Sequence, residues 1–557
     1  MFLLITNANI NTMDKTRPHA EAAVIIGSKF AFVGDNASAR EFAERSAPGA
    51  EEYDCGGAFL MPGFNDSHMH LLSYVLGKRS IDLSGARSID KLIERMREAI
   101  PNLGLTPGQW LVGMGWNQDD FEDEKRFPAI ADLDMISTEI PIVITRACFH
   151  AAVINTKAME LLELDEQSAE RYGEYAARWR EGIFVESGME AIGAAFASPP
   201  PGECLKLMLE SQEEFFERGI TSIQSNDFCV NDFRAGDDDE SWQLMESLRK
   251  AGEDGRLKLR ISGQITASDP ETLDAAFGRG LRGRGLRGRG LDGNYGNPHF
   301  CMNAIKLFTD GSLGARTAYL NAPYADDPST RGLMVLSPEN VTRIVEISHQ
   351  NGMPVAIHAI GDAAIDMCLD AIEAAQNTLP LPLRHGIVHS QITSEAQLER
   401  MKRLGVIVYT QPIFLDYDLR IVNARVGEAL AATSYAFKDY IDMGIPQSFG
   451  TDCPVEPFFP LECLYCAITR KTLHGEGPYR EDQALCAANA LRAYTTEGAY
   501  ASGEEDVKGM IREGMLADFV VFDRDLTAFA PEEMLGAKVL RTYVDGVQVF
   551  GQGSAEA

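Results

Sequence analysis

Two histidines, His68 and His70, stand two residues apart in the stretch MPGFNDSHMHLLSY, directly after an apolar segment and a Pro-Gly pair. Alternate side chains of an extended chain point to the same side, so both imidazoles project from one face of a strand or strand end. Two imidazoles on one face can bind one metal ion such as zinc. An isolated pair is about as often a packed pair without function, so a metal site needs further ligands from elsewhere in the chain.

The elements that would position such ligands are short apolar runs that end in polar residues. The first is GGAFLMPGFNDSHMH, residues 56–70. Seven more follow, at residues 219–227, 257–265, 301–311, 353–362, 383–391, 406–412 and 445–454. Helical-looking segments separate most of them, such as SEAQLERMKRLG, which ends at Gly405 as its predicted C-terminal cap. Eight strand-helix units of this kind predict an α/β fold, a parallel (β/α)8 TIM-like barrel.

Two further parts are predicted around this barrel. Residues 1–57 and 498–557 are rich in short strands and predict one small β-sandwich domain built from both ends of the chain. The barrel itself would comprise residues 58–75 and 201–497. A barrel of this type allots roughly 31 residues to each strand-helix unit. The segment from His68 on the first strand to Lys306 on the fourth is far longer than three such units. The excess, residues 76–200, predicts a lobe inserted over the barrel mouth.

Polar residues at the predicted strand ends could complete a metal site, because the active site of such a barrel lies at the carboxyl ends of its strands. Those ends carry Lys306 on strand four, His358 on strand five, His389 on strand six and Asp452 on strand eight. With the first pair, four imidazoles and a carboxylate would bind one or two divalent ions, for which zinc, iron and manganese are all suited. Only ten histidines occur in the chain, so four at strand ends are improbable by chance.

The motifs around these residues, taken together, resemble the amidohydrolase superfamily of metal-dependent hydrolases. They are PGFNDSHMH, KLFTDGSLGARTAYL, AIHAIGDAA, GIVHSQ and GTDCPVEP, closed by KGMIREGMLADFVVFD, and they span nearly the whole chain. Within the superfamily the chain resembles the YtcJ-like branch, which includes N-substituted formamide deformylases. Each motif is weak alone, and their combination is specific.

The resemblance implies a ligand set for the metal. His68 and His70 would hold the more buried ion, and His358 and His389 the more exposed one. Lys306 would bridge the two ions as a carbamate, since a protonated ammonium has no lone pair to donate. Without that modification Lys306 is an ordinary lysine paired with Asp310 or Asp362.

The resemblance also implies the reaction. Metal coordination lowers the pKa of a bound water to near neutrality, and the resulting hydroxide would attack the C–N bond of an amide or formamide. Asp452, a candidate ligand as well, would accept the proton and pass it to the leaving amine. Its alternative role is an N-cap in GTDCP.

Two alternative functions stay open. A mononuclear aminohydrolase, or deaminase, of the same superfamily usually carries a glutamate three residues after the strand-five histidine, where this chain has Gly361 followed by Asp362. A non-catalytic ligand-binding barrel would be expected to lack at least one member of the metal set, and none is missing from the sequence. Hydrolysis of an amide is therefore the leading hypothesis.

Three further residues are candidates for binding a small-molecule amide substrate. Trp116 and His150 belong to the predicted lobe, in GWNQDD and RACFHAAVIN, and could form a wall of the pocket. A tryptophan in such a segment is more often part of the core. Arg316 follows strand four in DGSLGARTA and could bind a substrate carboxylate or carbonyl, or pair with a neighbouring acid.

The composition narrows the choice of partners. The chain has 51 basic and 82 acidic residues, and a net charge of -31 disfavours nucleic acid and anionic membranes. A Gly-Arg tract at 278–291 could bind RNA, but in so acidic a chain it is better interpreted as an expanded surface loop. No run approaches the roughly 18 apolar residues of a membrane span, and the scattered cysteines predict a reduced, cytoplasmic protein. The oligomeric state stays open, a homodimer included.

Overall fold

The computed structural model describes residues 2–104, 109–171, 176, 178–196, 199–230, 240–278, 281 and 296–551. Over these ranges eight parallel strands form one curved sheet. They are β8 (Phe64–Met69), β14 (Ile220–Cys229), β15 (Arg260–Thr266), β16 (Phe300–Phe308), β17 (Val355–Ala359), β18 (Gly386–His389), β19 (Ile407–Thr410) and β20 (Gln447–Phe449).

The sheet closes into a barrel at the carboxyl ends of its first and last strands. The Asp452 N–H donates a hydrogen bond to the His68 carbonyl at 2.8 Å, and the His70 N–H donates to the Cys453 carbonyl at 2.7 Å. These bonds join the end of β8 to the loop after β20. The predicted (β/α)8 barrel is confirmed, and its closure involves three of the residues predicted to bind metal, namely His68, His70 and Asp452.

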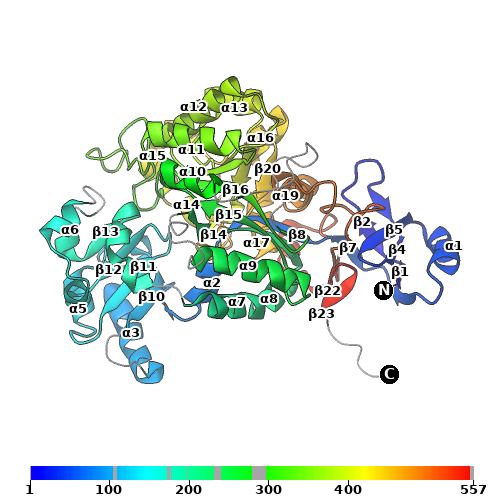
Figure 1. Ribbon diagram of the computed structural model, residues 1–557, viewed down its shortest axis with the longest axis horizontal. Helices are drawn as coiled ribbons and strands as arrows, with labels where there is room; N and C mark the ends of the chain where they lie inside the picture. Colours follow the sequence, from blue (N-terminus) through cyan, green and yellow to red (C-terminus); the bar gives the residue numbers. More distant parts are fainter. Residues whose placement is uncertain are drawn as a thin grey trace.

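Helices from the connections cover the outside of the barrel (Figure 1). They include α2 (Leu71–Gly77), α7 (Pro201–Glu210), α8 (Gln212–Phe216), α9 (Glu240–Glu253), α10 (Pro270–Gly278), α11 (Pro338–Gln350), α12 (Asp362–Thr378), α13 (Glu395–Leu404), α16 (Phe437–Met443), α17 (Pro460–Thr469), α18 (Ala487–Ala493) and α19 (Thr496–Ala501). Helices α14 (Leu415–Asp418) and α15 (Val422–Ala431) lie instead with the loops at the barrel mouth. On α12 the buried Ile365, Leu369 and Ile372 recur at helical spacing and pack on the barrel core.

The ends of α13 show how local sequence sets a boundary. The Ser394 side chain accepts a hydrogen bond from the Gln397 N–H at the start of the helix. Gly405 ends it with a φ of 66°, a left-handed conformation that glycine adopts without strain. The predicted C-terminal cap is confirmed.

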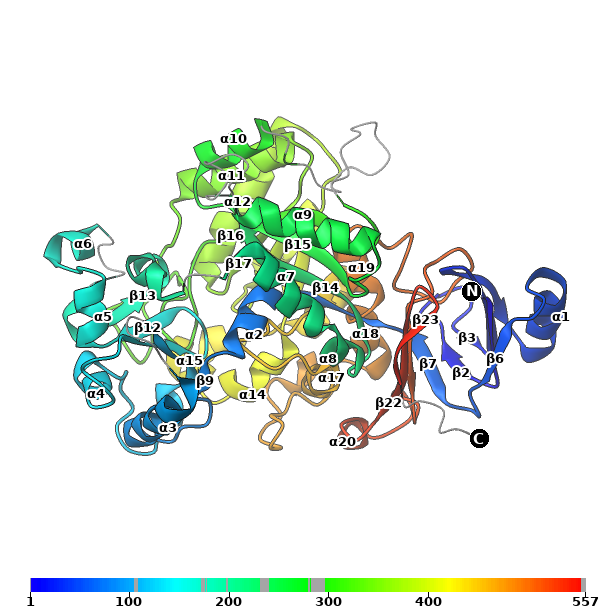
Figure 2. The ribbon, with the colours of Figure 1, turned by 60° about the horizontal axis from the view of Figure 1, so that its bottom comes forward.

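Strands from both chain ends form a β-sandwich, seen in Figure 2 as blue and red strands side by side at one end of the molecule. One sheet contains β1 (Phe2–Thr6), β4 (Ala22–Ile26), β5 (Lys29–Gly34) and β6 (Glu51–Asp54); the other contains β2 (Asn9–Asn11), β3 (His19–Ala20), β7 (Phe59–Pro62), β21 (Phe519–Phe522), β22 (Val539–Val544) and β23 (Val547–Gly551). Ile5 and Ile25 of the first sheet share a core with Leu60 and Phe519 of the second. Helices α1 (Asn36–Ser46) and α20 (Pro531–Met534) belong to the same terminal segments.

One segment differs from the prediction. Residues 56–70, predicted as a single barrel strand, form two strands in two sheets, because β7 pairs with β2 and β21 of the sandwich whereas β8 pairs with β14 of the barrel. Gly63 separates them, and a Cβ there would lie 2.3 Å from the Thr221 side chain. The backbone therefore passes close to β14 at the point where the chain enters the barrel.

The inserted lobe contains a mixed sheet of five strands within the described residues, drawn in cyan beside the barrel in Figure 1. They are β9 (Ile81–Asp82), β10 (Leu111–Trp116), β11 (Ile142–Arg146), β12 (Ala151–Ile154) and β13 (Ile183–Val185), with helices α3 (Ile89–Leu103), α4 (Ile130–Asp134), α5 (Thr156–Leu161) and α6 (Glu166–Glu170). Arg425 of α15 forms ion pairs with Asp119 of the lobe at 3.1 Å and with Asp326 at 2.5 Å. The lobe is thereby joined to the loops at the barrel mouth.

No helix in the described ranges combines the length and the apolar composition needed to cross a membrane. The Gly-Arg tract lies outside the described residues except for Gly278 and Leu281.

Candidate active site

Four imidazoles meet at the carboxyl ends of three barrel strands. The ring centroids of His68 and His70 are 5.2 Å apart, those of His68 and His389 are 5.8 Å apart, and those of His358 and His389 are 4.5 Å apart. These four residues line one cavity of about 380 Å³ together with Lys306 and Asp452. The structure thus brings together all six residues predicted as metal ligands.

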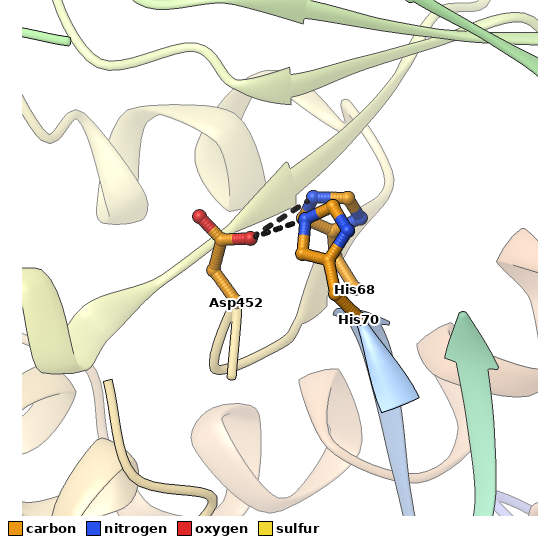
Figure 3. A group of neighbouring side chains, drawn as sticks. All are labelled: His68, His70 and Asp452. Atoms are coloured by element: carbon orange, nitrogen blue, oxygen red, sulfur yellow. Dashed lines mark hydrogen bonds and ion pairs between the residues drawn. The ribbon is translucent and has the colours of Figure 1, made fainter. Parts of the chain in front are cut away.

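Asp452 connects the two histidines of the opening motif (Figure 3). Its Oδ1 lies 3.3 Å from His68 Nε2 and 3.1 Å from His70 Nε2. The potential ligand atoms of these three residues all lie within 4.8 Å of one another. Asp452 has a φ of 61°, a strained value for a residue with a side chain, which the hydrogen bonds at the barrel closure hold in place. This group has the residue types and the spacing of a metal site.

The two remaining imidazoles are oriented from behind by polar side chains. His358 Nδ1 lies 3.0 Å from Asp310 Oδ1, and His389 Nδ1 lies 2.9 Å from Gln411 Oε1. A ligand histidine usually donates its second ring N–H in this way, which directs the other nitrogen at the metal. His358 Nε2 is buried without a hydrogen-bond partner among the described residues, as a nitrogen reserved for a metal would be.

Lys306 is fully buried and lines the same cavity as the four imidazoles. Its Nζ has no hydrogen-bond partner in the described structure and lies 4.0 Å from the centre of the Phe308 ring. Burial lowers the pKa of Lys306 to about 7. The pairing with Asp310 or Asp362 is not observed, because Asp310 contacts His358 and Asp362 accepts hydrogen bonds from Asn321. An unpaired buried ammonium is unfavourable, so the position suits a neutral amine or a derivative of it.

The protonation states match those that metal ligands need. Burial lowers the pKa of His68 to about 4 and that of His389 to about 3, and it holds the pKa of His358 well below its ordinary value. Burial alone would raise the pKa of Asp452, but hydrogen bonds with the neighbouring imidazoles hold this pKa well below the ordinary value. Neutral imidazoles and an ionised carboxylate can all donate lone pairs to a cation. On this chemistry and on the unpartnered buried nitrogens, the residues fit a divalent metal.

The predicted substrate-binding residues have different locations. His150 lines the same cavity, and its ring lies 5.2 Å from that of His358. Trp116 is fully buried in the core of the lobe, 5.1 Å from the Phe127 ring, and is not among the residues that line the described cavities. Arg316 pairs with Asp326 at 2.7 Å and lines neither cavity.

Three residues of the site were not predicted as functional. Asp310 lies two residues after β16 and Gln411 lies one residue after β19, where strand-end position could have revealed them. Glu186 also lines the cavity and contacts His150 at 2.6 Å. No local motif marks it, because its place depends on how the lobe folds.

A second, larger cavity of about 840 Å³ adjoins the first. The two cavities share Cys148, Phe149, Pro454 and Val455 as lining residues. Aromatic side chains form part of the larger one, namely those of Phe414, Tyr417, Phe458 and Phe459. A ligand that spans both cavities could place a small group among the imidazoles and a larger apolar group beside the lobe.

The barrel and its converging ligands define a metal-dependent hydrolase. The chain belongs to the amidohydrolase family, whose sequence profile matches residues 51–550. It is 30% identical over 522 residues to the Bacillus subtilis (strain 168) protein named as amidohydrolase YtcJ, covering 90% of this chain and 91% of that protein. It is 26% identical over 559 residues to the N-substituted formamide deformylase of Arthrobacter pascens, which covers 98% of this chain and 97% of that protein. An uncharacterized metal-dependent hydrolase from Pyrococcus horikoshii OT3 has a similar solved structure, with a TM-score of 0.75, 30% identity, and coverage of 95% of this chain and 99% of that one.

Proposed function

We propose that the protein hydrolyses the C–N bond of a small amide, with N-substituted formamides as the first substrate class to test. The observation that carries the proposal is the set of four imidazoles around Lys306 and Asp452 in one cavity of about 380 Å³. Such a site supplies cation ligands and a carboxylate base side by side, which are the groups that metal-assisted hydrolysis of an amide uses.

The geometry of the cavity supports an assignment of the residues that would hold the metal. His68, His70 and Asp452 would hold one ion, and His358 and His389 a second, with zinc as the first metal to test. Carbon dioxide and the neutral amine of Lys306 would form a carbamate with release of one proton, and this carbamate would supply a further anionic ligand for the metal. A divalent ion bound here polarises the substrate carbonyl and lowers the pKa of a nearby water.

Asp452 would move the proton. Its carboxylate is ionised and lies within 3.3 Å of two imidazole nitrogens at the mouth of the barrel. From there it can accept a proton from the attacking water and return it to the leaving nitrogen as the C–N bond breaks. The proton thereby ends on the amine product.

The adjoining cavity supports a substrate with a sizeable N-substituent. The acyl group would lie among the imidazoles, and an apolar N-substituent would lie against aromatic residues such as Phe414 and Phe458. The Arthrobacter pascens relative, named for activity on N-substituted formamides, supports the same class. Deamination has less support. Deaminases of the superfamily usually carry a glutamate three residues after the strand-five histidine, and this chain has Gly361 there. The carboxylate of the next residue, Asp362, accepts hydrogen bonds from Asn321 at 2.9 and 3.0 Å at the start of α12.

The test combines metal analysis with an amide screen. Elemental mass spectrometry of natively purified protein, with and without added bicarbonate, should find close to two ions per chain and a gain on bicarbonate addition. The protein should release aniline from formanilide, and it should do so more slowly from acetanilide. Asp452→Asn should reduce the rate of formanilide hydrolysis by about 10²- to 10⁴-fold. Asp274→Asn, a change at an exposed site on α10, is the matched control. A metal-loaded protein that hydrolyses no amide but deaminates cytosine or adenine would overturn the proposal.

A further inference from the structure

The inserted lobe brings a second pair of polar side chains, His150 and Glu186, to the cavity. The two residues lie opposite each other in the lobe sheet, where Ala151 of β12 pairs antiparallel with Val185 of β13. The Glu186 N–H donates a hydrogen bond to the His150 carbonyl at 3.0 Å. The register of this sheet therefore places the two side chains together, although they are distant in sequence.

The side chains form one unit. His150 Nδ1 lies 2.6 Å from Glu186 Oε2, and the Glu186 side chain is only 4% exposed. A carboxylate behind an imidazole sets the ring orientation and leaves Nε2 as the nitrogen free to meet a ligand.

The surroundings make room for this pair. A Cβ at position 311 would lie 2.0 Å from Glu186 Oε1, so the glycine in the loop after β16 lets the carboxylate approach. Glu186 has a φ of 47° and Phe149, next to His150, has a φ of 61°. Strained backbone of this kind is found where the surrounding structure holds a side chain in a functional position. The same cavity holds His150, Glu186 and the six candidate metal ligands.

We propose that His150 donates a hydrogen bond from Nε2 to the acyl oxygen of the substrate, and that Glu186 is the residue that positions it. This inference rests on the proposed amide hydrolysis. Negative charge develops on the acyl oxygen as water attacks the carbonyl carbon, and a fixed donor in a buried site stabilises that charge. The lobe thus completes the site as well as shaping the substrate cavity.

The test compares His150→Asn and Glu186→Gln with a matched control. His299→Asn removes a histidine–carboxylate pair of the same kind, His299 Nε2 to Asp545 Oδ2 at 2.9 Å, that lines neither described cavity. His150→Asn should lower kcat on formanilide by about 10²- to 10³-fold at unchanged metal content. Glu186→Gln should lower it by about 10- to 100-fold, and the double variant should be no slower than His150→Asn. The control should match wild type.

A binding measurement separates this inference from the proposed function. Acetohydroxamate, which mimics a metal-bound amide oxygen, should bind the zinc-loaded His150→Asn variant about tenfold more weakly than wild type in calorimetry. Wild-type affinity and kcat in His150→Asn would refute the inference. If no amide is hydrolysed and the affinity still depends on His150, the proposed function fails and the contact stands. If His150→Asn loses its metal, the kcat of metal-loaded Glu186→Gln decides: a reduced value supports the inference, and a wild-type value refutes it.

Discussion

Replacing Gly450 by alanine is expected to open the barrel at the candidate metal site. A Cβ at this position would lie 2.5 Å from the His68 nitrogen and 2.9 Å from the His68 oxygen. Both are backbone atoms of β8 and cannot rotate away as a side chain could. Because unstrained contacts need roughly 3.5 Å, the loop after β20 must move away from β8 by about 1 Å.

The size of the effect follows from the bonds that this movement stretches. The two hydrogen bonds that close the barrel, 2.8 and 2.7 Å long, would lengthen to nearly 4 Å. Each contributes about 0.5–1.5 kcal/mol, and overpacking costs about 1–3 kcal/mol. We therefore expect a loss of about 2–6 kcal/mol in the free energy of unfolding. Asp452 moves with the loop, so it also separates from His68 and His70.

The assay measures zinc content and the thermal unfolding midpoint of Gly450→Ala. Gly202→Ala is the matched control, since a Cβ there meets open space on α7 and alanine favours a helix by up to about 1 kcal/mol. Gly450→Ala should lose bound zinc and unfold at a lower temperature, whereas the control should unfold at the wild-type temperature or above. A Gly450→Ala protein with wild-type zinc content and midpoint would refute the reasoning.

Three further predictions concern buried charge and metal. His385, buried 2.8 Å from His349, has a pKa lowered by burial from 6.5 to about 3. As pH falls below 6.5, His385 binds a proton in the unfolded chain but not in the folded one, so wild type should lose about 1.4 kcal/mol of unfolding free energy per pH unit relative to His385→Gln. Denaturant unfolding of both proteins between pH 6.5 and 4.5 measures this loss, and a difference between them that stays constant with pH would contradict the prediction. Asp518→Ala should destabilise the protein by about 3–5 kcal/mol, because Arg260 is buried between the barrel and the sandwich and donates hydrogen bonds to Asp518 at 2.5 and 2.9 Å. An unchanged thermal unfolding midpoint would contradict this and show that the remaining bond to Asp545 is enough to stabilise the Arg260 charge. Removal of metal with a chelator should lower the thermal unfolding midpoint, and added zinc at about 1,000 times its Kd should restore about 4 kcal/mol of unfolding free energy. A midpoint that neither treatment changes would contradict the binding of metal by the folded state.

The sequence predicted the barrel and the positions of its polar strand ends because both are local properties. Apolar runs at regular intervals indicate strands, and the carboxyl ends of parallel strands meet at one mouth. Lys306, His358 and His389 could therefore be assigned to one site although they are distant in the chain, and the structure places them in one cavity. The same logic could not separate β7 from β8, because the apolar pattern is continuous across Gly63 and only pairing with different partners divides it.

The sequence by itself determined which residues could form the site, namely four histidines, a lysine and an aspartate at strand ends. Residue types and the apolar pattern that indicates strands are both local properties of the sequence. Only the tertiary structure decided how these groups are oriented and what else reaches them. Asp310 and Gln411 orient two of the imidazoles, and Glu186 reaches the cavity from a lobe whose own sheet sets its register. Trp116, which a motif alone could place in a pocket, is instead buried in the lobe core. Orientation and burial depend on contacts between segments that are distant in sequence, and no local pattern records which of those contacts form.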